Sequence, residues 1–284
     1  MDNETTPHLP LELARADEFR RLLSTITIDG AGGMEAYAHE DCERFIRSVQ
    51  MIPAGVTSVL EIGGNPYFTT LLMKWFRPEI EVTCTNFFGR DWSAKSQKIE
   101  IDMPAGERET YHIAFENCNV EEDRLPDGPF DCVLFCEVLE HMTNDPLHPL
   151  REINRVLKDG GHLVLTTPNV ARLENVARLM GGHNLYDPYS AYGPYGRHNR
   201  EYTKHELNEV LIHCGFAPET LQTHDVHQNR AEDYFPNAKQ LMPLLQFREA
   251  DLGQYHFTHS VKARNPAIGR PAWLYRSYPA EDLV

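Results

Sequence analysis

The spacing of hydrophobic residues along the chain changes near residue 56. Residues 11–25 and 35–51 carry apolar side chains at helical spacing, which predicts two amphipathic helices. After residue 56, short apolar runs alternate with amphipathic stretches. Strands that alternate with helices are typical of an α/β fold with a mostly parallel sheet and helices on both faces.

This alternation predicts the following elements. We expect strands at residues 56–62, 80–86, 111–120, 130–136, 162–167, 216–223 and 255–263, and helices at residues 67–76, 147–157 and 204–214. Residues 168–202 interrupt the pattern with glycines, prolines and tyrosines, and long irregular segments within domains are often functional loops. We therefore expect an N-terminal helical cap (1–54), a main domain (55–265) that contains this insertion, and a C-terminal docking segment (266–284).

Composition and charge restrict the partners that the chain is expected to have. The net charge of −15, from 42 acidic and 27 basic residues, repels phosphate backbones, so nucleic acid is not an expected partner. No apolar run approaches the ~18–20 residues that span a bilayer, and the start of the chain does not resemble a secretory signal. Six cysteines without a CxxC pair fit a reducing compartment. We expect a cytoplasmic protein without a membrane partner, and homo-oligomerisation stays open.

A tight turn after the first predicted strand of the main domain is the strongest local motif. The strand ends at Glu61-Ile62 and continues into Gly63-Gly64-Asn65-Pro66, and ligands of parallel sheets bind at this edge. A dinucleotide site would have GxGxxG spacing, which is absent here. The carboxylate of Glu61 suits a cationic amino acid better than it suits phosphates. The turn therefore favours S-adenosylmethionine over NAD.

Two further motifs follow in order, FDCVLFCEVLEH at residues 130–141 and EINRVLKDGGHLVLTTPN at residues 152–169. Together with the glycine turn, they resemble the class I S-adenosylmethionine-dependent methyltransferases over about residues 55–225. The stretch at residues 195–203 and the helix after it resemble members from polysaccharide and secondary-metabolite pathways. The resemblance implies a Rossmann-like sheet of seven strands, in which the last strand, at residues 255–263, is reversed.

The resemblance also implies a set of cofactor-binding positions. These are Glu61, Gly63, Gly64 and Asn65 at the methionine end, Asn86 beside the ribose, Asn119 and Val120 beside the adenine, and Glu137 in the pocket wall. Asn86 replaces the usual acidic residue, and its amide bonds a hydroxyl more weakly than a carboxylate does. The turn also departs from the usual ExGxGxG. Both departures leave open an inactive protein that has kept the fold as a binding or scaffold subunit.

Two histidines are the candidate catalytic residues. Methyl transfer is an in-line displacement, and a hydroxyl acceptor benefits from a base. His141 ends the second motif at the expected pocket edge, although it could instead orient the loop. His198 lies in the insertion, which we expect to bind the acceptor, and the alternative for this stretch is a helix cap formed by Thr203 and Glu206.

We expect methylation of a hydroxyl on a sugar or a related small metabolite. N-methylation of an amino sugar or another small amine is the nearest alternative, and an NAD-dependent oxidoreductase is disfavoured by the turn. The HxxH pairs His224/His227 and His256/His259 seldom form a zinc site without further ligands. We therefore expect no metal.

Overall fold

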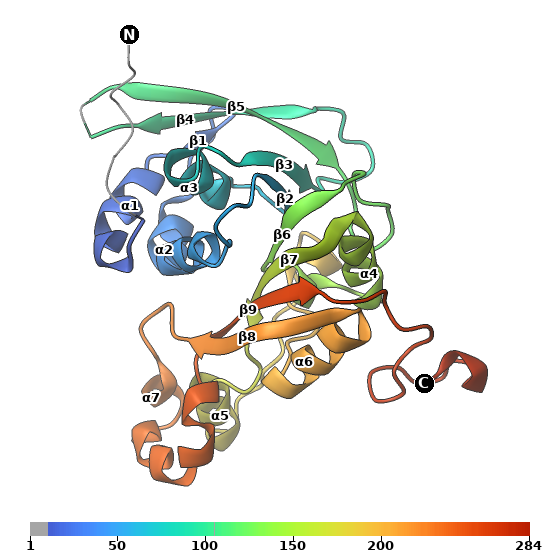
Figure 1. Ribbon diagram of the computed structural model, residues 1–284. Coiled ribbons are helices and arrows are strands. Elements are labelled where there is room, and N and C mark those ends of the chain that lie inside the picture. The colour runs from blue at the N-terminus through green and yellow to red at the C-terminus, as the bar shows by residue number, and fades with distance from the viewer. Residues whose placement is uncertain (1–10, 105) are drawn as a thin grey trace.

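The computed structural model describes residues 11–104 and 106–284, and these residues form a nine-stranded sheet with helices on both faces (Figure 1). The strand order is β1-β4-β5-β3-β2-β6-β7-β9-β8. The strands are β1 (Thr27–Ile28), β2 (Ser58–Ile62), β3 (Glu81–Asn86), β4 (Ser96–Asp102), β5 (Arg108–Asn117), β6 (Phe130–Cys136), β7 (Leu157–Pro168), β8 (Phe216–His224) and β9 (Tyr255–Lys262).

The central strands confirm the predicted α/β fold. Strands β5, β3, β2, β6 and β7 run parallel to one another. Strand β9 pairs antiparallel with both β7 and β8, so the reversed last strand also lies where it was predicted. Each of the seven predicted strands has a counterpart in the sheet.

The predicted count of seven strands is wrong for the described part of the chain, because β1 and β4 extend the sheet beyond β5 to nine strands. Strand β4 pairs antiparallel with β5, and β1 pairs antiparallel with β4. The side chains of Ile99 and Ile101 on β4 alternate inward and are fully buried. Alternation over so few residues is a weak signal in sequence, and pairing with β5 is what makes this segment a strand.

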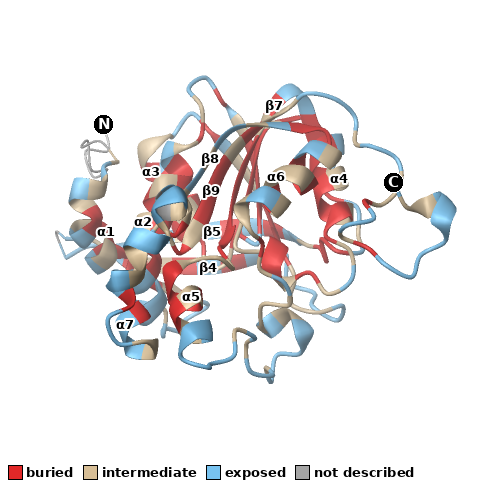
Figure 2. Ribbon diagram, turned by 90° about the horizontal axis from the view of Figure 1, so that it is seen from below, coloured by how far each residue is buried: buried red, intermediate tan, exposed pale blue. Residues whose placement is uncertain are grey.

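Two layers of helices cover the sheet (Figure 2). The helices are α1 (Ala16–Leu23), α2 (Glu35–Gln50), α3 (Phe68–Phe76), α4 (Leu147–Val156), α5 (Leu173–Met180), α6 (Lys204–His213) and α7 (Ala231–Tyr234). Val59 and Leu134 pack in one hydrophobic cluster with α1, α2 and α3, while Leu60 and Val133 pack in another with α4 and α6. Neighbouring residues of a strand therefore bury opposite faces, which explains why these strands are continuously apolar.

The sequence had indicated that the insertion at residues 168–202 is irregular. The structure corrects this expectation, because helix α5 lies within the insertion. Leu173 and Ala177 of this helix pack against Ala231 and Leu252 in a small separate cluster. The partners of α5 come from residues 226–252, which had no clear pattern in sequence. A helix of eight residues is marginal without such packing, so its own sequence does not predict it.

The C-terminal segment contacts the α4 side of the molecule. Arg151 on α4 donates a hydrogen bond to the Gly269 carbonyl at 2.5 Å. The Tyr275 hydroxyl donates to an Asp145 carboxylate oxygen at 2.5 Å, and Tyr275 is 7% exposed. Within the described residues, no helix combines the length and the apolar content that crossing a membrane requires.

Thr203 caps α6, as the sequence had suggested. Its hydroxyl accepts the Glu206 amide N–H at 3.2 Å, and the Glu206 carboxylate accepts the Thr203 N–H at 3.1 Å. We expect Thr203→Ala to lower the free energy of unfolding by about 1 kcal/mol, because the N-terminus of α6 loses the hydroxyl that caps it. Urea denaturation would measure the loss, with Thr203→Ser as the matched control. Equal stability of the two variants would contradict the role of the hydroxyl.

Candidate active site

The glycine turn lies at the carboxyl end of β2 and is hydrogen-bonded to the neighbouring strand β3. The N–H groups of Gly63 and Gly64 donate to the Thr85 carbonyl at 2.8 and 3.3 Å. The Asn65 N–H donates to the side-chain oxygen of Asn86 at 2.8 Å. Because these three N–H groups already have partners, the turn does not offer the free donors that bind a pyrophosphate. This geometry agrees with the predicted preference against a dinucleotide.

Gly63 occupies a position that only glycine fits without strain. Its φ is +73°, in the left-handed region, and a Cβ added there would lie 2.9 Å from a methyl carbon of Val138. Gly64 has no positive φ, and a Cβ there would meet Cys84 at 3.5 Å, an ordinary contact. Of these two glycines, only Gly63 therefore lies so close to the residues that follow β6 that a side chain would not fit.

A cavity of about 210 Å³ opens beside the turn. Most of the predicted cofactor residues line it, namely Gly63, Asn86, Asn119, Val120 and Glu137, and His141 lines it as well. Asn86 is 4% exposed, and its NH₂ group donates to the Tyr67 hydroxyl at 3.0 Å. An amide has two N–H donors and two acceptor lone pairs, so Asn86 keeps one of each for a ribose hydroxyl. The donor and acceptor chemistry of this cavity fits an adenosine.

The other predicted residues, Glu61, Gly64 and Asn65, line a smaller cavity on the α2 side of the turn. Burial raises the pKa of Glu61 to about 7, although a hydrogen bond from the Thr70 hydroxyl opposes this shift. Arg44, which sequence reasoning missed, lines the same cavity and is 3% exposed. A carboxylate and a guanidinium together match the ammonium and carboxylate groups of a methionine moiety.

The pKa of Glu61 leads to a prediction for cofactor affinity. Below about pH 7 the folded protein keeps Glu61 protonated, and only the ionised carboxylate attracts an ammonium group. Affinity for S-adenosylmethionine should therefore rise by up to about tenfold from pH 6 to pH 8, with about fivefold of the rise below pH 7 and about twofold above it. Glu61→Gln should bind more weakly and lose this rise. Calorimetric titration of both proteins at pH 6, 7 and 8 would measure the difference.

Burial also raises the pKa of Glu137, but Glu137 is present in both proteins and its effect cancels in the comparison. Parallel pH dependences for the wild type and Glu61→Gln would show that Glu61 does not pair with the cofactor.

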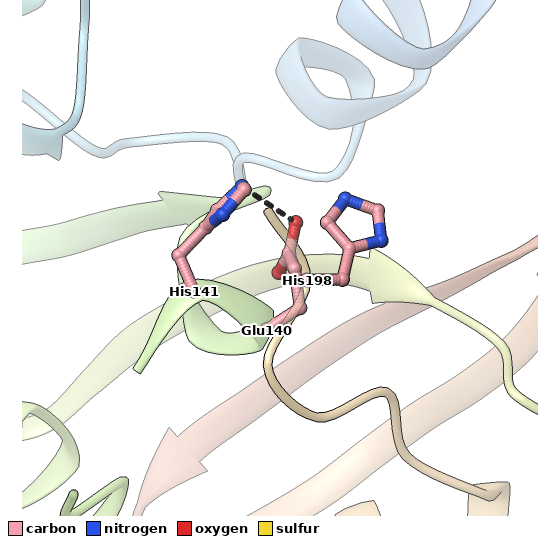
Figure 3. A group of neighbouring side chains, drawn as sticks. All are labelled: Glu140, His141 and His198. Atoms are coloured by element: carbon pink, nitrogen blue, oxygen red, sulfur yellow. Dashed lines mark ion pairs between the residues drawn. The ribbon is translucent and has the colours of Figure 1, made fainter. Parts of the chain in front are cut away.

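The two candidate catalytic histidines lie side by side (Figure 3). Their ring centroids are 5.1 Å apart and the rings are nearly perpendicular, at 74°. His141 ends the short 3₁₀ helix η2 (Leu139–His141) after β6, whereas His198 belongs to the insertion loop. The loop is bonded to η2 by the N–H groups of Asn199 and Arg200, which donate to the Glu140 carbonyl at 2.8 and 3.1 Å.

The surroundings give the two imidazoles different properties. The Nδ1 atom of His141 lies 2.9 Å from the Arg197 carbonyl, so this nitrogen carries the proton and Nε2 keeps its lone pair. Burial lowers the pKa of His141. Burial has the same effect on His198, but a hydrogen bond to Glu201 and the nearby carboxylate of Glu140 outweigh it and raise the pKa to about 9.

Tyr195 brings the insertion loop over the cofactor cavity, a contact that the sequence did not predict. It lines the 210 Å³ cavity and accepts a hydrogen bond from the Asn119 amide at 3.1 Å. Its hydroxyl donates to Glu121 at 3.0 Å, and its ring meets Phe87 edge-on with centroids 6.1 Å apart. Only the folded loop shows which of its tyrosines points inward.

Larger cavities border His198. A cavity of about 770 Å³ is lined by Met142, Tyr186, Asp187 and His198, among other residues, and Met142 also lines the cofactor cavity. Another cavity, of about 450 Å³, is also bordered by His198. His141 and His198 thus lie where the 210 Å³ cavity and the larger cavity adjoin, whereas Glu61, Gly64 and Asn65 lie on the other side of the turn.

The HxxH pairs have other partners. A ring nitrogen of His256 lies 3.0 Å from the Tyr202 carbonyl, and one of His227 lies 3.0 Å from the Tyr255 hydroxyl. His259 lies against His162, with ring nitrogens 3.1 Å apart.

Comparison with known proteins identifies the class. Residues 20–221 match the model of the family described as methyltransferase domain. The match covers more than half of the chain, and the chain belongs to this family. It is an S-adenosylmethionine-dependent methyltransferase, as the motifs predicted.

The solved structures that are similar to this chain have low sequence identity to it. A chain from the complex between the Haloferax volcanii Trm112 methyltransferase activator and a protein assigned as a methyltransferase is 14% identical, with a TM-score of 0.52 over 82% of this chain and 92% of that one. An S-adenosylmethionine-dependent methyltransferase from Archaeoglobus fulgidus is 16% identical, with a TM-score of 0.49 over 81% of this chain and 95% of that one. Human N-acetylserotonin methyltransferase in complex with SAM is 12% identical, with a TM-score of 0.47 over 81% of this chain and 55% of that one. No curated protein matches the sequence closely enough to count as a relative.

Proposed function

We propose that this enzyme methylates a hydroxyl group of a small polar acceptor, a sugar or a related metabolite, in the cytoplasm. The observation that carries the proposal is the position of His141. It lines the cofactor cavity, its Nε2 keeps an unprotonated lone pair, and it faces His198 at the edge of the 770 Å³ cavity. A hydroxyl needs such a base, whereas an unprotonated amine does not.

The cofactor supplies a methyl group on a positively charged sulfur. As the acceptor oxygen bonds to the methyl carbon, the carbon–sulfur bond breaks and its electron pair stays on sulfur. The Nε2 atom of His141 takes the hydroxyl proton. His198, which carries a proton at neutral pH because of its raised pKa, can hold the acceptor oxygen by donating a hydrogen bond.

The walls of the larger cavity support a polyhydroxyl acceptor. Asn144, Asp187 and Arg200 border it and supply both donors and acceptors. Tyr186 also borders it and is 83% exposed, so its ring is available to pack against the face of a sugar.

The nearest alternative is methylation of an amino sugar or another small amine. The carboxylates of Asp187 and Glu206 border the same cavity and could bind an ammonium group. Such a reaction would follow the ionisation of the substrate, so its pH profile would change with the amine used. A hydroxyl acceptor would give a profile governed by groups on the enzyme.

The partners that we propose are limited to the cofactor, the small acceptor and a second copy of the chain if the enzyme forms homo-oligomers. The net charge of −15 supports the exclusion of nucleic acid, because a phosphate backbone would be repelled. We extend this exclusion to membrane surfaces that carry anionic lipids.

Calorimetric titration with S-adenosylmethionine and S-adenosylhomocysteine tests the proposal first. We expect dissociation constants on the order of 1 μM, about −8 kcal/mol. Hydroxyl and amine acceptors would then be screened for methylated products by mass spectrometry. Failure to bind either ligand would contradict the cofactor site. Cofactor binding without turnover on any acceptor would favour the inactive scaffold.

A further inference from the structure

Three neighbouring side chains, Glu140, His141 and His198, lie beside the place where the cavities adjoin (Figure 3). One ligand atom from each of Glu140, His141 and His198 lies within 4.8 Å of the other two. The Glu140 carboxylate stands between the two imidazole rings, and its Oε1 lies 3.8 Å from Nε2 of His141. The 3.8 Å separation is too long for a hydrogen bond, but it suits two ligands of one ion at metal–ligand distances of about 2.0–2.2 Å.

The Oε1 atom of Glu140 has no hydrogen-bond partner among the described residues. Glu140 is 0% exposed, so water does not reach this oxygen from the surface. Its other oxygen accepts a hydrogen bond from the Thr167 hydroxyl at 3.0 Å. Buried carboxylates are ordinarily paired or bind a metal, and an orphaned oxygen that points at two imidazoles requires an explanation.

Each of the two histidines has a hydrogen-bond partner at Nδ1, as metal-binding histidines commonly do. Nδ1 of His141 bonds to the Arg197 carbonyl at 2.9 Å, and Nδ1 of His198 bonds to the Glu201 carboxylate at 3.0 Å. A metal-binding histidine almost always donates its other ring N–H to a carbonyl or a carboxylate. Both rings have this arrangement, so Nε2 of each ring faces away from its partner, and Nε2 of His198 releases its proton when a metal ion binds.

We infer that Glu140, His141 and His198 bind one divalent transition-metal ion. Two imidazoles and one carboxylate are a ligand set for zinc or iron(II), whereas Mg²⁺ prefers an all-oxygen shell. Three protein ligands leave an open position, as in catalytic zinc sites. The sequence had led us to expect no metal because it drew attention to the HxxH pairs instead, and these have other partners.

The catalytic role of the ion rests on the proposed function, although its binding does not. A hydroxyl that occupies the open position would lose its proton more readily, since a divalent metal lowers the pKa of a bound hydroxyl group. The proton would pass to water, and the oxygen would then displace the sulfur from the methyl carbon. With the metal bound, His141 would be a ligand, and the ion would activate the acceptor in its place.

Metal binding can be measured without any acceptor. Untagged protein would be freed of metal with a chelator, dialysed and titrated with Zn²⁺ and Mg²⁺ at pH 8, with Co²⁺ absorption as a spectroscopic readout of imidazole ligation. We expect one Zn²⁺ per chain, bound at least about tenfold more tightly than Mg²⁺. Glu140→Gln and His198→Ala should each weaken Zn²⁺ binding by at least about tenfold.

The matched control is His259→Ala, which removes a histidine from the other close pair, His162 and His259, and should leave Zn²⁺ binding unchanged. Circular dichroism would confirm that each variant is folded. Absence of stoichiometric binding, or wild-type affinity in both cluster variants, would overturn the inference. Titration of the metal-free protein with S-adenosylmethionine tests the methyltransferase function separately. A wrong metal site and a wrong proposed function would therefore give different results.

Discussion

Replacing His141 with alanine is expected to lower kcat by about 10²- to 10⁴-fold with little change in the affinity for S-adenosylmethionine. The Nε2 lone pair is the group that is lost, because Nδ1 is already bonded to the Arg197 carbonyl. His198→Ala should also lower kcat, since His198 lies against His141 and borders the larger cavity. Turnover of the acceptor identified in the screen would be compared with cofactor binding by calorimetry.

His205→Ala is the control for these variants, because His205 is exposed on α6 and should leave both quantities unchanged. Wild-type turnover in both His141→Ala and His198→Ala would remove the catalytic role of the two histidines. The loss of kcat by itself does not separate a base from a metal ligand, because both roles use Nε2. Comparing the wild-type rate before and after removal of metal separates them, since a base retains its activity.

Gly63→Ala is expected to weaken S-adenosylmethionine binding by about tenfold or more. A side chain in the left-handed region costs about 1–2 kcal/mol, so the turn of the free variant relaxes away from this conformation. Restoring the turn on binding costs that energy, and each 1.4 kcal/mol corresponds to a factor of ten in affinity. The added Cβ would also lie 2.9 Å from Val138. Since Gly63 and Val138 both line the cofactor cavity, the displaced atoms would move within the binding site.

Gly64→Ala is the matched control for this prediction. The new Cβ would meet Cys84 and Glu61 at 3.5 Å, so the turn has room for it and its backbone is not strained. Calorimetry on both variants would measure the difference in affinity, and thermal denaturation would show whether both remain folded. Equal affinities of the two variants would mean that the turn does not restrict the cofactor.

The candidate site was predictable where residues near in sequence create it. Glu61 and Gly63 lie at the carboxyl end of one strand, and Glu137 and His141 follow another, so parallel pairing brings them to one edge. The structure places these residues around two cavities beside the glycine turn. Arg44 and Tyr195 were missed because nothing in the local sequence of α2 or of the insertion shows which polar side chain points inward.

The sequence by itself determined the periodic elements, their order and the class of cofactor. Periodicity of apolar residues is local, and strands such as β6 show it without reference to the rest of the chain. Only the tertiary structure decided the added strands β1 and β4, the helix α5, and the convergence of Glu140, His141 and His198. The physical reason is that each of these depends on contacts between distant segments. Local preferences of a few residues are too weak to fix such contacts until the chain has folded.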